Sequence, residues 1–261
     1  YYSNDHLLNI NKKEKYPVEC WDITSYDNNI LVAENDVISY TNDIKGKNII
    51  LKTFPWTLKK SITNSSEFFV GLDNGFMKIK INDNGNVKDT TLFDEVKSSV
   101  FNISYEPKEK RYWLGTLNNG VYKYNIGNSD IVNYDTLDGL PEGPVYIGSI
   151  DEKYYFGTEK GLYRYNNNKK EENFVKADKL EKQLFPKNDN RLIHRILPQE
   201  NGTTWLVTYL NDKEKFDIGR VVTDEKKDEI RWENAAFQPI KGVIHDIYTT
   251  ENNVTWLGGL N

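Results

Sequence analysis

One stretch of the chain decides the fold: YWLGTLNNGVYKY, at residues 112–124. Its first five residues are aromatic, aliphatic or small, which is typical of a buried strand. The pair Asn119-Gly120 follows as a turn, because glycine supplies the positive φ that a tight hairpin needs. After the glycine, apolar and polar residues alternate up to Tyr124, which predicts a strand with one buried face. The stretch is therefore a β-hairpin.

The same pattern recurs along the chain. Residues 68–79 (FFVGLDNGFMKI) and 154–165 (YYFGTEKGLYRY) repeat the hairpin, and 30–34 (ILVAE), 204–208 (TWLVT) and 255–259 (TWLGG) begin further copies. The marker positions of these copies lie 38 to 51 residues apart, at Ala33, Gly71, Gly115, Gly157, Val207 and Gly258. A period of that length suits four short strands per unit.

Two further strands complete each unit. An apolar pair spaced i, i+3 precedes most copies and predicts an inner strand, as at Val100 and Ile103, Ile193 and Ile196, and Ile244 and Ile247. In the second unit this strand is expected within residues 54–62. A fourth strand follows each hairpin, as at 131–134, and residues 177–184 predict a short helical turn. The sequence thus predicts an all-β fold, a β-propeller of four-stranded antiparallel blades, with about six blades here and six or seven in the full ring.

The two ends of the chain fit this period. Residues 7–10 followed by Tyr16-Pro17 match residues 131–134 followed by Leu140-Pro141, so the chain is expected to start on an outer strand. It would then stop two strands into its last blade. Either the first strand closes the ring against that blade, or both ends are cut from a longer array, which the stop at 259–261 favours. We expect residues 1–261 to be one propeller domain of a longer multidomain protein.

Composition and missing motifs exclude several classes of function. The net charge is −5 and no segment concentrates basic residues, so nucleic acid is not an expected partner. The single cysteine, Cys20, excludes an intrachain disulfide and a cysteine zinc site. No apolar run reaches roughly 18 residues, so no membrane span is expected within the segment. No hydrolase, metalloprotease or nucleotide-binding motif is present. The segment is therefore not expected to be an enzyme, and no cofactor, metal or catalytic residue is predicted.

The repeat unit resembles a known family. Trp-Leu-Gly-Thr and Asn-Gly-Val-Tyr-Lys-Tyr within 113–124, with Asp-Gly-Leu-Pro at 138–141, are similar to the two-component-regulator propeller repeat. The resemblance covers 99–165 most fully and extends to 192–208 and 243–259. In that family, such propellers form the extracytoplasmic sensors of hybrid two-component system histidine kinases, and several members sense products of glycan breakdown.

The resemblance has three implications for this chain. It implies a sensor role in bacterial signal transduction and a location in the periplasm, outside the inner membrane. It also implies an oligosaccharide or other small-molecule ligand. The expected partners are neighbouring domains or a second subunit of the same protein. Because the matching residues belong to the scaffold, the ligand itself is not identified by them.

The candidate binding residues come from the predicted topology. Hairpin turns and the loops before the inner strands should share one face of a propeller, whose planar polar and aromatic groups suit an oligosaccharide or a protein loop. Arg195 is a further candidate because it lies next to His194 in an inner strand. The candidate ligand-binding residues are Trp56, Asp73, Asn118, Asn119, Glu159 and Arg195. Asn74 and Lys160 are expected at the same rim.

Two histidines leave another possibility open. His194 and His245 occupy matching positions in two inner strands, where they either bind a metal, act as acid and base, or simply repeat one structural position. A lyase or hydrolase would need one of them in the channel beside a carboxylate. A protein-interaction propeller without a small ligand is the other alternative, and its mark would be an exposed aromatic patch.

Overall fold

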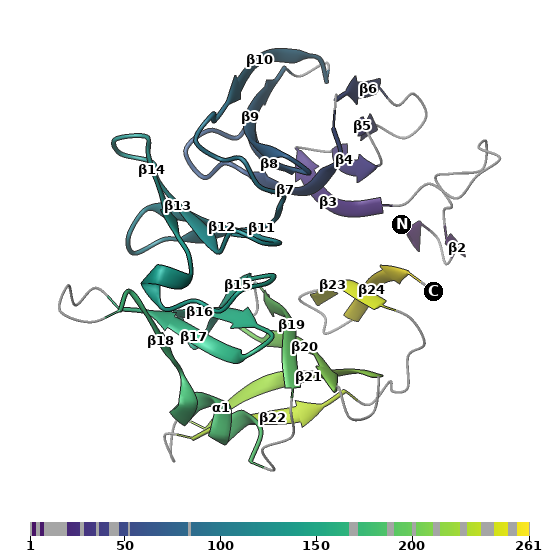
Figure 1. Ribbon diagram of the computed structural model, residues 1–261. Coiled ribbons are helices and arrows are strands. Elements are labelled where there is room, and N and C mark those ends of the chain that lie inside the picture. Colours follow the sequence, from purple (N-terminus) through teal and green to yellow (C-terminus); the bar gives the residue numbers. More distant parts are fainter. Residues whose placement is uncertain are drawn as a thin grey trace. The chain divides into compact units, whose positions relative to one another are not determined.

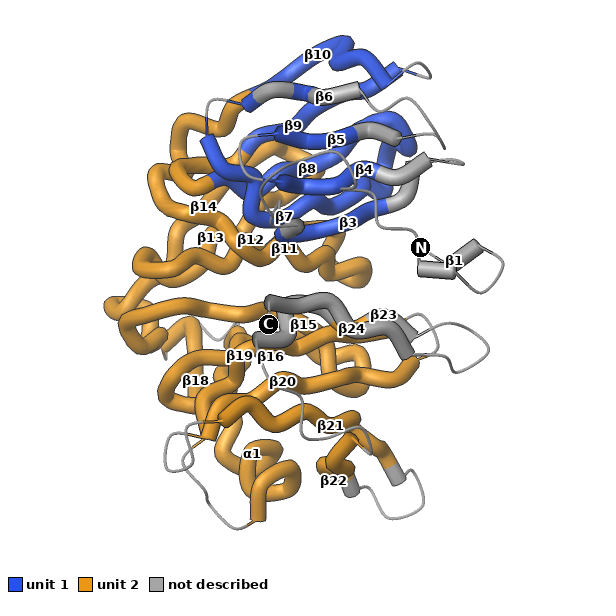
Figure 2. Tube along the Cα trace, turned by 90° about the vertical axis from the view of Figure 1, so that its right-hand side faces the viewer, with its two compact units in different colours: residues 1–72, 77–91 blue, residues 73–76, 92–261 orange. Residues whose placement is uncertain are grey.

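The computed structural model describes residues 2–3, 6–7, 20–26, 29–34, 37–41, 47–51, 53–82, 85–166, 172–186, 191–199, 202–210, 215–224, 229–235, 243–249 and 255–260. The chain divides into two compact units, which are coloured separately in Figure 2. Unit 1 contains residues 1–72 and 77–91, and unit 2 contains residues 73–76 and 92–261.

Five four-stranded antiparallel sheets follow one another along the described chain (Figure 1). Blade 1 contains β3 (Cys20–Tyr26), β4 (Asn29–Glu34), β5 (Val37–Thr41) and β6 (Lys47–Ile50). Blade 2 contains β7 (Pro55–Lys60), β8 (Glu67–Leu72), β9 (Gly75–Ile81) and β10 (Val87–Leu92). Blade 3 contains β11 (Val100–Glu106), β12 (Arg111–Thr116), β13 (Val121–Asn125) and β14 (Asp130–Tyr134). Blade 4 contains β15 (Tyr146–Ile150), β16 (Lys153–Thr158), β17 (Gly161–Tyr165) and β18 (Phe174–Lys176). Blade 5 contains β19 (Arg191–Pro198), β20 (Thr204–Leu210), β21 (Lys215–Asp224) and β22 (Glu229–Asn234).

The blade architecture is confirmed, but the expected number of blades is wrong. The described residues form five complete blades and not about six. The sixth marker, Gly258, belongs to a two-stranded sheet of β23 (Val243–Thr249) and β24 (Thr255–Leu260). At the other end β1 (Tyr2–Ser3) pairs with β2 (His6–Leu7), whereas residues 8–10 of the expected outer strand lie outside the described residues. The sequence marker identifies one hairpin and not a whole blade. A two-stranded sheet such as β23 and β24 therefore has the marker although it is not a complete blade.

Within each unit the first strand of one blade contacts the first strand of the next, as β3 does with β7 in unit 1 and as β15 does with β11 and β19 in unit 2. These inner strands carry one irregularity, a shift of register within β3, β7, β11, β19 and β23. In β11 the shift inserts Phe101 between Val100 and Asn102. A bulged residue of this kind offsets the alternation by one position. That is why Val100 and Ile103, three apart, are both buried, at 0% and 6% exposure.

The threonine of the repeat closes the hairpin. Thr116 is buried; its Oγ1 donates to the Gly120 carbonyl at 2.9 Å and accepts from the Asn119 amide at 2.9 Å. Thr158 does the same in blade 4, with the Gly161 carbonyl at 2.9 Å and the Lys160 amide at 3.1 Å. A hydroxyl can serve both as donor and as acceptor, so one threonine satisfies two backbone groups of a tight turn. The glycine and threonine of the repeat therefore have different structural roles.

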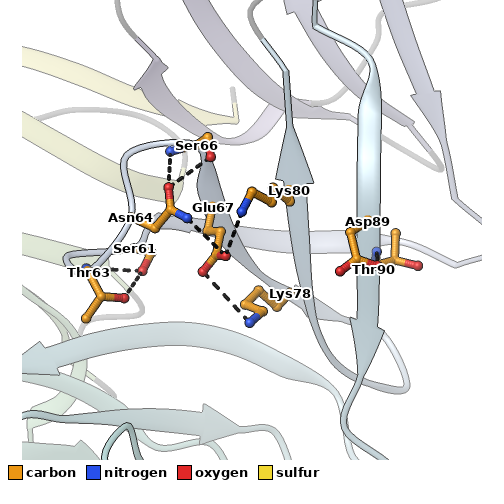
Figure 3. A network of polar contacts seen from close by, with 9 residues as sticks. All are labelled: Ser61, Thr63, Asn64, Ser66, Glu67, Lys78, Lys80, Asp89 and Thr90. Carbon is orange, nitrogen blue, oxygen red and sulfur yellow. Dashed lines mark hydrogen bonds and ion pairs between the residues drawn. The ribbon is translucent and has the colours of Figure 1, made fainter.

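A polar network holds blade 2 at the start of β8 (Figure 3). Glu67 lies 3.8 Å from the Lys78 ammonium and 3.7 Å from the Lys80 ammonium, and it accepts from Asn64 Nδ2 at 3.2 Å. Asn64 Oδ1 in turn accepts from the amide and the hydroxyl of Ser66. The network ties the loop before β8 to two alternate residues of β9, so it supports the fold of unit 1.

The insertion between blades 4 and 5 forms the expected helix. Helix α1 (Asp178–Leu184) starts one residue later than the predicted turn. It buries Leu180 and Leu184 in the core that also contains Leu162 and Leu206. Glu181 Oε2 accepts from the Leu162 amide at 3.0 Å, so the helix is bonded to the hairpin of blade 4. A short 3₁₀ helix at Thr136–Asp138 precedes β15 and is capped by Asp135.

One turn of unit 2 is strained. Asp151 and Glu152 connect β15 to β16 with φ of 51° and 58°, a conformation that costs a residue other than glycine roughly 1–2 kcal/mol. We expect Glu152→Gly to raise the free energy of unfolding by about 1 kcal/mol, measured by urea denaturation. Glu152 Oε2 pairs with Lys108 Nζ at 2.9 Å, but both side chains are exposed, so the pair contributes little.

Glu152→Gln is the matched control. It removes the charge without relieving the backbone strain, and its effect should stay within about 0.5 kcal/mol. If the glycine variant is no more stable than the glutamine variant, strain in this turn is not a significant cost.

Candidate functional site

Three inner strands of unit 2 bring four side chains together. Phe101 is the bulged residue of β11, Tyr146 begins β15, and His194 and Arg195 lie side by side in β19. The Phe101 and Tyr146 ring centroids are 4.7 Å apart, and those of Tyr146 and His194 are 5.0 Å apart. The guanidinium carbon of Arg195 lies 4.4 Å from the Tyr146 ring centroid and 6.0 Å from that of Phe101. We call these four residues the inner-strand cluster.

In the inner-strand cluster the Arg195 guanidinium lies over the rings of Tyr146 and Phe101. Arg195 donates from Nη1 to the His194 carbonyl at 2.8 Å, which fixes the guanidinium beside the Tyr146 ring. Tyr146 is 8% exposed, whereas Phe101, His194 and Arg195 are half-buried. An arginine over an aromatic face is stabilised by the ring quadrupole and keeps a planar edge of N–H donors. Such a surface can stack on the apolar face of a sugar ring and donate hydrogen bonds to its hydroxyls.

A bulge places two of these rings, whereas Tyr146 lies in β15, which pairs without a shift of register. The bulge inserts Phe101 in β11 and His194 in β19, and a bulge re-aims the side chain it carries. The next residue links the neighbouring blade, since Asn102 Oδ1 accepts from the Ile147 amide at 2.9 Å. In unit 1 Asp22 has the same role, accepting from the Leu58 amide at 2.7 Å. The sequence signal of such a bulge is an aromatic residue followed by a hydrogen-bonding residue, with an apolar residue on either side of the pair. Phe101 and Tyr146 were not among the binding residues predicted from the sequence.

Two of the rim candidates lie where the topology predicted, each in a hairpin turn beside a loop that enters an inner strand. Ser99 Oγ, just before β11, donates to the Asp73 carbonyl at 2.5 Å and to its Oδ1 at 3.2 Å. Glu159 lies beside the loop before β15, because a Cβ built on Gly143 would be 3.7 Å from its carboxyl carbon. Both residues are exposed, and they remain predicted ligand contacts.

The asparagines of the blade 3 turn differ from each other. Asn119 Nδ2 donates to the Tyr122 hydroxyl at 2.7 Å, and its carbonyl accepts from Asn133 Nδ2 at 3.0 Å. Its side chain therefore supports the hairpin. Asn118 is exposed at the tip of the same turn, and it remains a predicted ligand contact.

Trp56 belongs to unit 1 and forms a separate aromatic group there. It is the bulged residue of β7, and its ring stands edge-on to that of Trp21 with centroids 4.6 Å apart. Phe54 stacks on it at 6.3 Å and is 42% exposed. Trp56 thus has the same place in β7 that Phe101 has in β11.

The histidine pair is only half described. The His194 ring packs against Tyr146 and Phe216, whose centroids lie 5.0 Å and 5.1 Å from it. The side chain of His245 lies outside the described residues. In the described part of the chain, no group of three His, Cys, Asp or Glu side chains could hold a metal ion.

No helix among the described residues is long and apolar enough to cross a membrane.

Comparison with solved structures supports the propeller fold. Two structures of the extracellular domain of a B. thetaiotaomicron protein, described as a one component system and as a hybrid two component system, are each 16% identical to this chain. They cover 92% of it with TM-scores of 0.57 and 0.56, while the chain spans 37% and 36% of their length. The β-propeller domain of Cps50 (Swd1) from Myceliophteria thermophila is 10% identical to this chain, with a TM-score of 0.57. The match covers 88% of this chain and 75% of the Cps50 domain.

These likenesses define the class of the protein by its fold alone. The chain is a β-propeller of four-stranded antiparallel blades. No family model matches it, and no curated protein matches it either. The two-component-regulator propeller repeat therefore stays a resemblance, which residues 113–124 and 138–141 carry.

Proposed function

We propose that the chain is part of the extracytoplasmic sensor propeller of a bacterial two-component signalling protein. The observation that carries the proposal is the fold likeness over 92% of the chain to an extracellular domain described as belonging to such a system. The repeat sequence at 113–124 points to the same class independently of the fold. Because the chain spans about a third of that domain, it would supply one portion of the sensor.

The proposed ligand is carbohydrate-like, and the inner-strand cluster is its proposed binding site. Phe101 is half-buried and offers an apolar face, and the guanidinium of Arg195 stands beside it over the buried Tyr146 ring. Sugars present both an apolar ring face and many hydroxyls, so they match a surface that combines stacking with hydrogen bonding. The exposed rim residues Asp73, Asn118 and Glu159 would extend the contact to a longer oligosaccharide.

Binding at this site would act on the packing of blades. The four side chains come from β11, β15 and β19, which are the first strands of three consecutive blades. A ligand that contacts all three favours the arrangement in which they lie closest, and a ligand shifts an equilibrium only through such differential contacts. The signal would therefore be a change in blade or domain packing without any chemical reaction.

A thermal-shift screen of the purified chain against a panel of oligosaccharides tests the proposal. A ligand that binds only the native state raises the melting temperature by mass action. With the best ligand, Arg195→Gln should weaken binding about tenfold or more, because it removes a charged donor from the site. Arg220→Gln is the matched control, since Arg220 is an exposed arginine of β21 paired with Glu233.

The outcomes separate the alternatives. A shift that disappears in Arg195→Gln and persists in Arg220→Gln supports the site. If no oligosaccharide shifts the wild-type chain, the small-ligand sensor is rejected in favour of a protein-interaction propeller.

A further inference from the structure

A lysine between two tyrosines marks a second feature of unit 2. Lys123 lies in β13, Tyr134 ends β14 of the same blade, and Tyr165 ends β17 of blade 4. Lys123 Nζ donates to Tyr134 Oη at 2.6 Å and to Tyr165 Oη at 3.5 Å. It also lies over both rings, 5.0 Å and 5.3 Å from their centroids. We call these three residues the lysine–tyrosine site.

The ammonium has no counter-ion in this site. Among the described residues, Lys123 forms no ion pair with a carboxylate. The ion pair of Arg111 with Glu106, whose N and O atoms are 2.6 Å apart, adjoins this site, because the guanidinium carbon of Arg111 lies 5.2 Å from the Tyr165 ring centroid. Glu106 is thus matched by Arg111, and Lys123 adds an unbalanced positive charge to the seam between blades 3 and 4. A lysine that merely extends along an apolar surface ends in water, whereas this one is held by a tyrosine that is 7% exposed.

The three side chains of the lysine–tyrosine site have more hydrogen-bond donors than acceptors. An ammonium has three donors and no acceptor, so both phenol oxygens accept from Lys123. The two phenol oxygens are 3.1 Å apart, and only one of the hydroxyls can donate to the other. One phenol hydrogen and one ammonium hydrogen therefore have no acceptor among the described residues. Burial raises the pKa of Tyr165, and the hydrogen bond with Tyr134 raises it further, so this hydroxyl stays protonated at neutral pH.

We propose that the lysine–tyrosine site binds an oxyanion, the carboxylate or sulfate group of an acidic ligand. One oxyanion can accept from the remaining ammonium hydrogen and the remaining phenol hydrogen at once, and it neutralises the unbalanced charge. The half-buried position of Lys123 and Tyr165 leaves the group open to solvent on one side while the rings limit its hydration. Because the residues come from β13, β14 and β17, the site is separate from the inner-strand cluster, and it does not depend on the sensor proposal.

Isothermal titration calorimetry of the chain with sodium sulfate and with sodium glucuronate tests the inference, with glucose as the neutral reference. We expect one anion per chain and a dissociation constant on the order of millimolar, as for a small ion held by a few hydrogen bonds. Lys123→Gln should weaken binding about tenfold or more, since it removes the charged donor. Tyr165→Phe removes only a hydroxyl and should weaken binding several-fold while it keeps the ring, so it serves if Lys123→Gln fails to fold.

Lys153→Gln is the matched control. Lys153 is a lysine of blade 4 that is 74% exposed and is not part of the lysine–tyrosine site, so this variant makes the same change of net charge. Binding that is lost in Lys123→Gln and kept in Lys153→Gln supports the inference, and the stronger of the two anions identifies the source of the oxyanion. Absence of anion binding in the wild type, or equal loss in both lysine variants, overturns it. Neutral oligosaccharides would still report on the inner-strand cluster, so the two proposals can fail separately.

Discussion

Replacing Gly115 by alanine should lower the free energy of unfolding by about 3 kcal/mol, a fall of roughly 6–12 °C in melting temperature. A Cβ on Gly115 would lie 2.1 Å from the Val145 carbonyl oxygen and 3.3 Å from its carbonyl carbon. Both atoms are backbone at the entrance to β15, so no rotamer change relieves the contact. The next blade would have to move, and thermal or urea unfolding measures that cost directly.

Gly127→Ala provides the matched control for this prediction. Gly127 lies in the turn between β13 and β14, and a Cβ there meets nothing within 4 Å. The same added methyl should change stability by less than about 0.5 kcal/mol. If the two variants are equally destabilised, the close approach of blade 4 is not what requires glycine at position 115.

Gly115 also explains why the repeat marker is detectable in the sequence. In blade 4 the equivalent Gly157 would place a Cβ 2.5 Å from Ile193 of blade 5, so the marker records close contact between consecutive blades. Val207 replaces the glycine in blade 5, and there it packs in a core cluster with Ile218 and Ile247. Periodicity alone finds these positions, but the distance between blades that selects the residue is a tertiary property.

The spacing of apolar residues in the inner strands indicates a bulge, which the periodicity alone did not predict. A pair at i, i+3 does not fit simple strand alternation, and the bulge resolves the conflict by adding one residue. The strand expected within 54–62 has the same arrangement, because Pro55 and Leu58 are both buried on either side of Trp56. Its pattern was hard to recognise because a proline takes the first apolar position of β7.

The candidate site was predictable only where one blade determines it. The rim turns follow from hairpin topology within a blade, and Asp73 and Glu159 lie as that topology implies. The inner-strand cluster depends on contacts between blades, with Phe101 and Tyr146 separated by a whole repeat unit. The aromatic and polar pair at 101–102 marks Phe101 only within its own blade, and a buried-strand pattern explains Tyr146 as core, so no local signal joins the two into one surface. Arg195 was found because it lies next to His194 in a predicted inner strand.

Trp113→Ala should have a larger effect than Gly115→Ala, a loss of about 4 kcal/mol in the free energy of unfolding. Trp113 is 0% exposed, and its ring lies 5.0 Å from Phe156 and 5.1 Å from Tyr165 of blade 4, centroid to centroid. Its Nε1 donates to Glu106 at 2.8 Å, which also holds Arg111. Alanine leaves a cavity between two blades and removes a donor from a half-buried carboxylate, and both changes destabilise the same seam.

Two variants separate these contributions. Trp113→Phe keeps most of the apolar contact and loses the donor, so we expect an intermediate loss of about 1–2 kcal/mol. Leu137→Ala truncates a side chain that is 92% exposed and should change stability by less than about 0.5 kcal/mol. If Trp113→Ala behaves like Leu137→Ala, blades 3 and 4 do not depend on this contact.

Hydrogen exchange locates the damage along the chain. In repeat proteins each unit is stabilised mainly by its neighbours, so loss of one contact lowers protection first in the units that share it. Trp113→Ala should therefore speed amide exchange in β12 and β16 more than in β20, although all three are central strands of their sheets. Equal acceleration in the three strands would mean that the blades of unit 2 unfold as one cooperative body, and the stability of its sites would then depend on every blade alike.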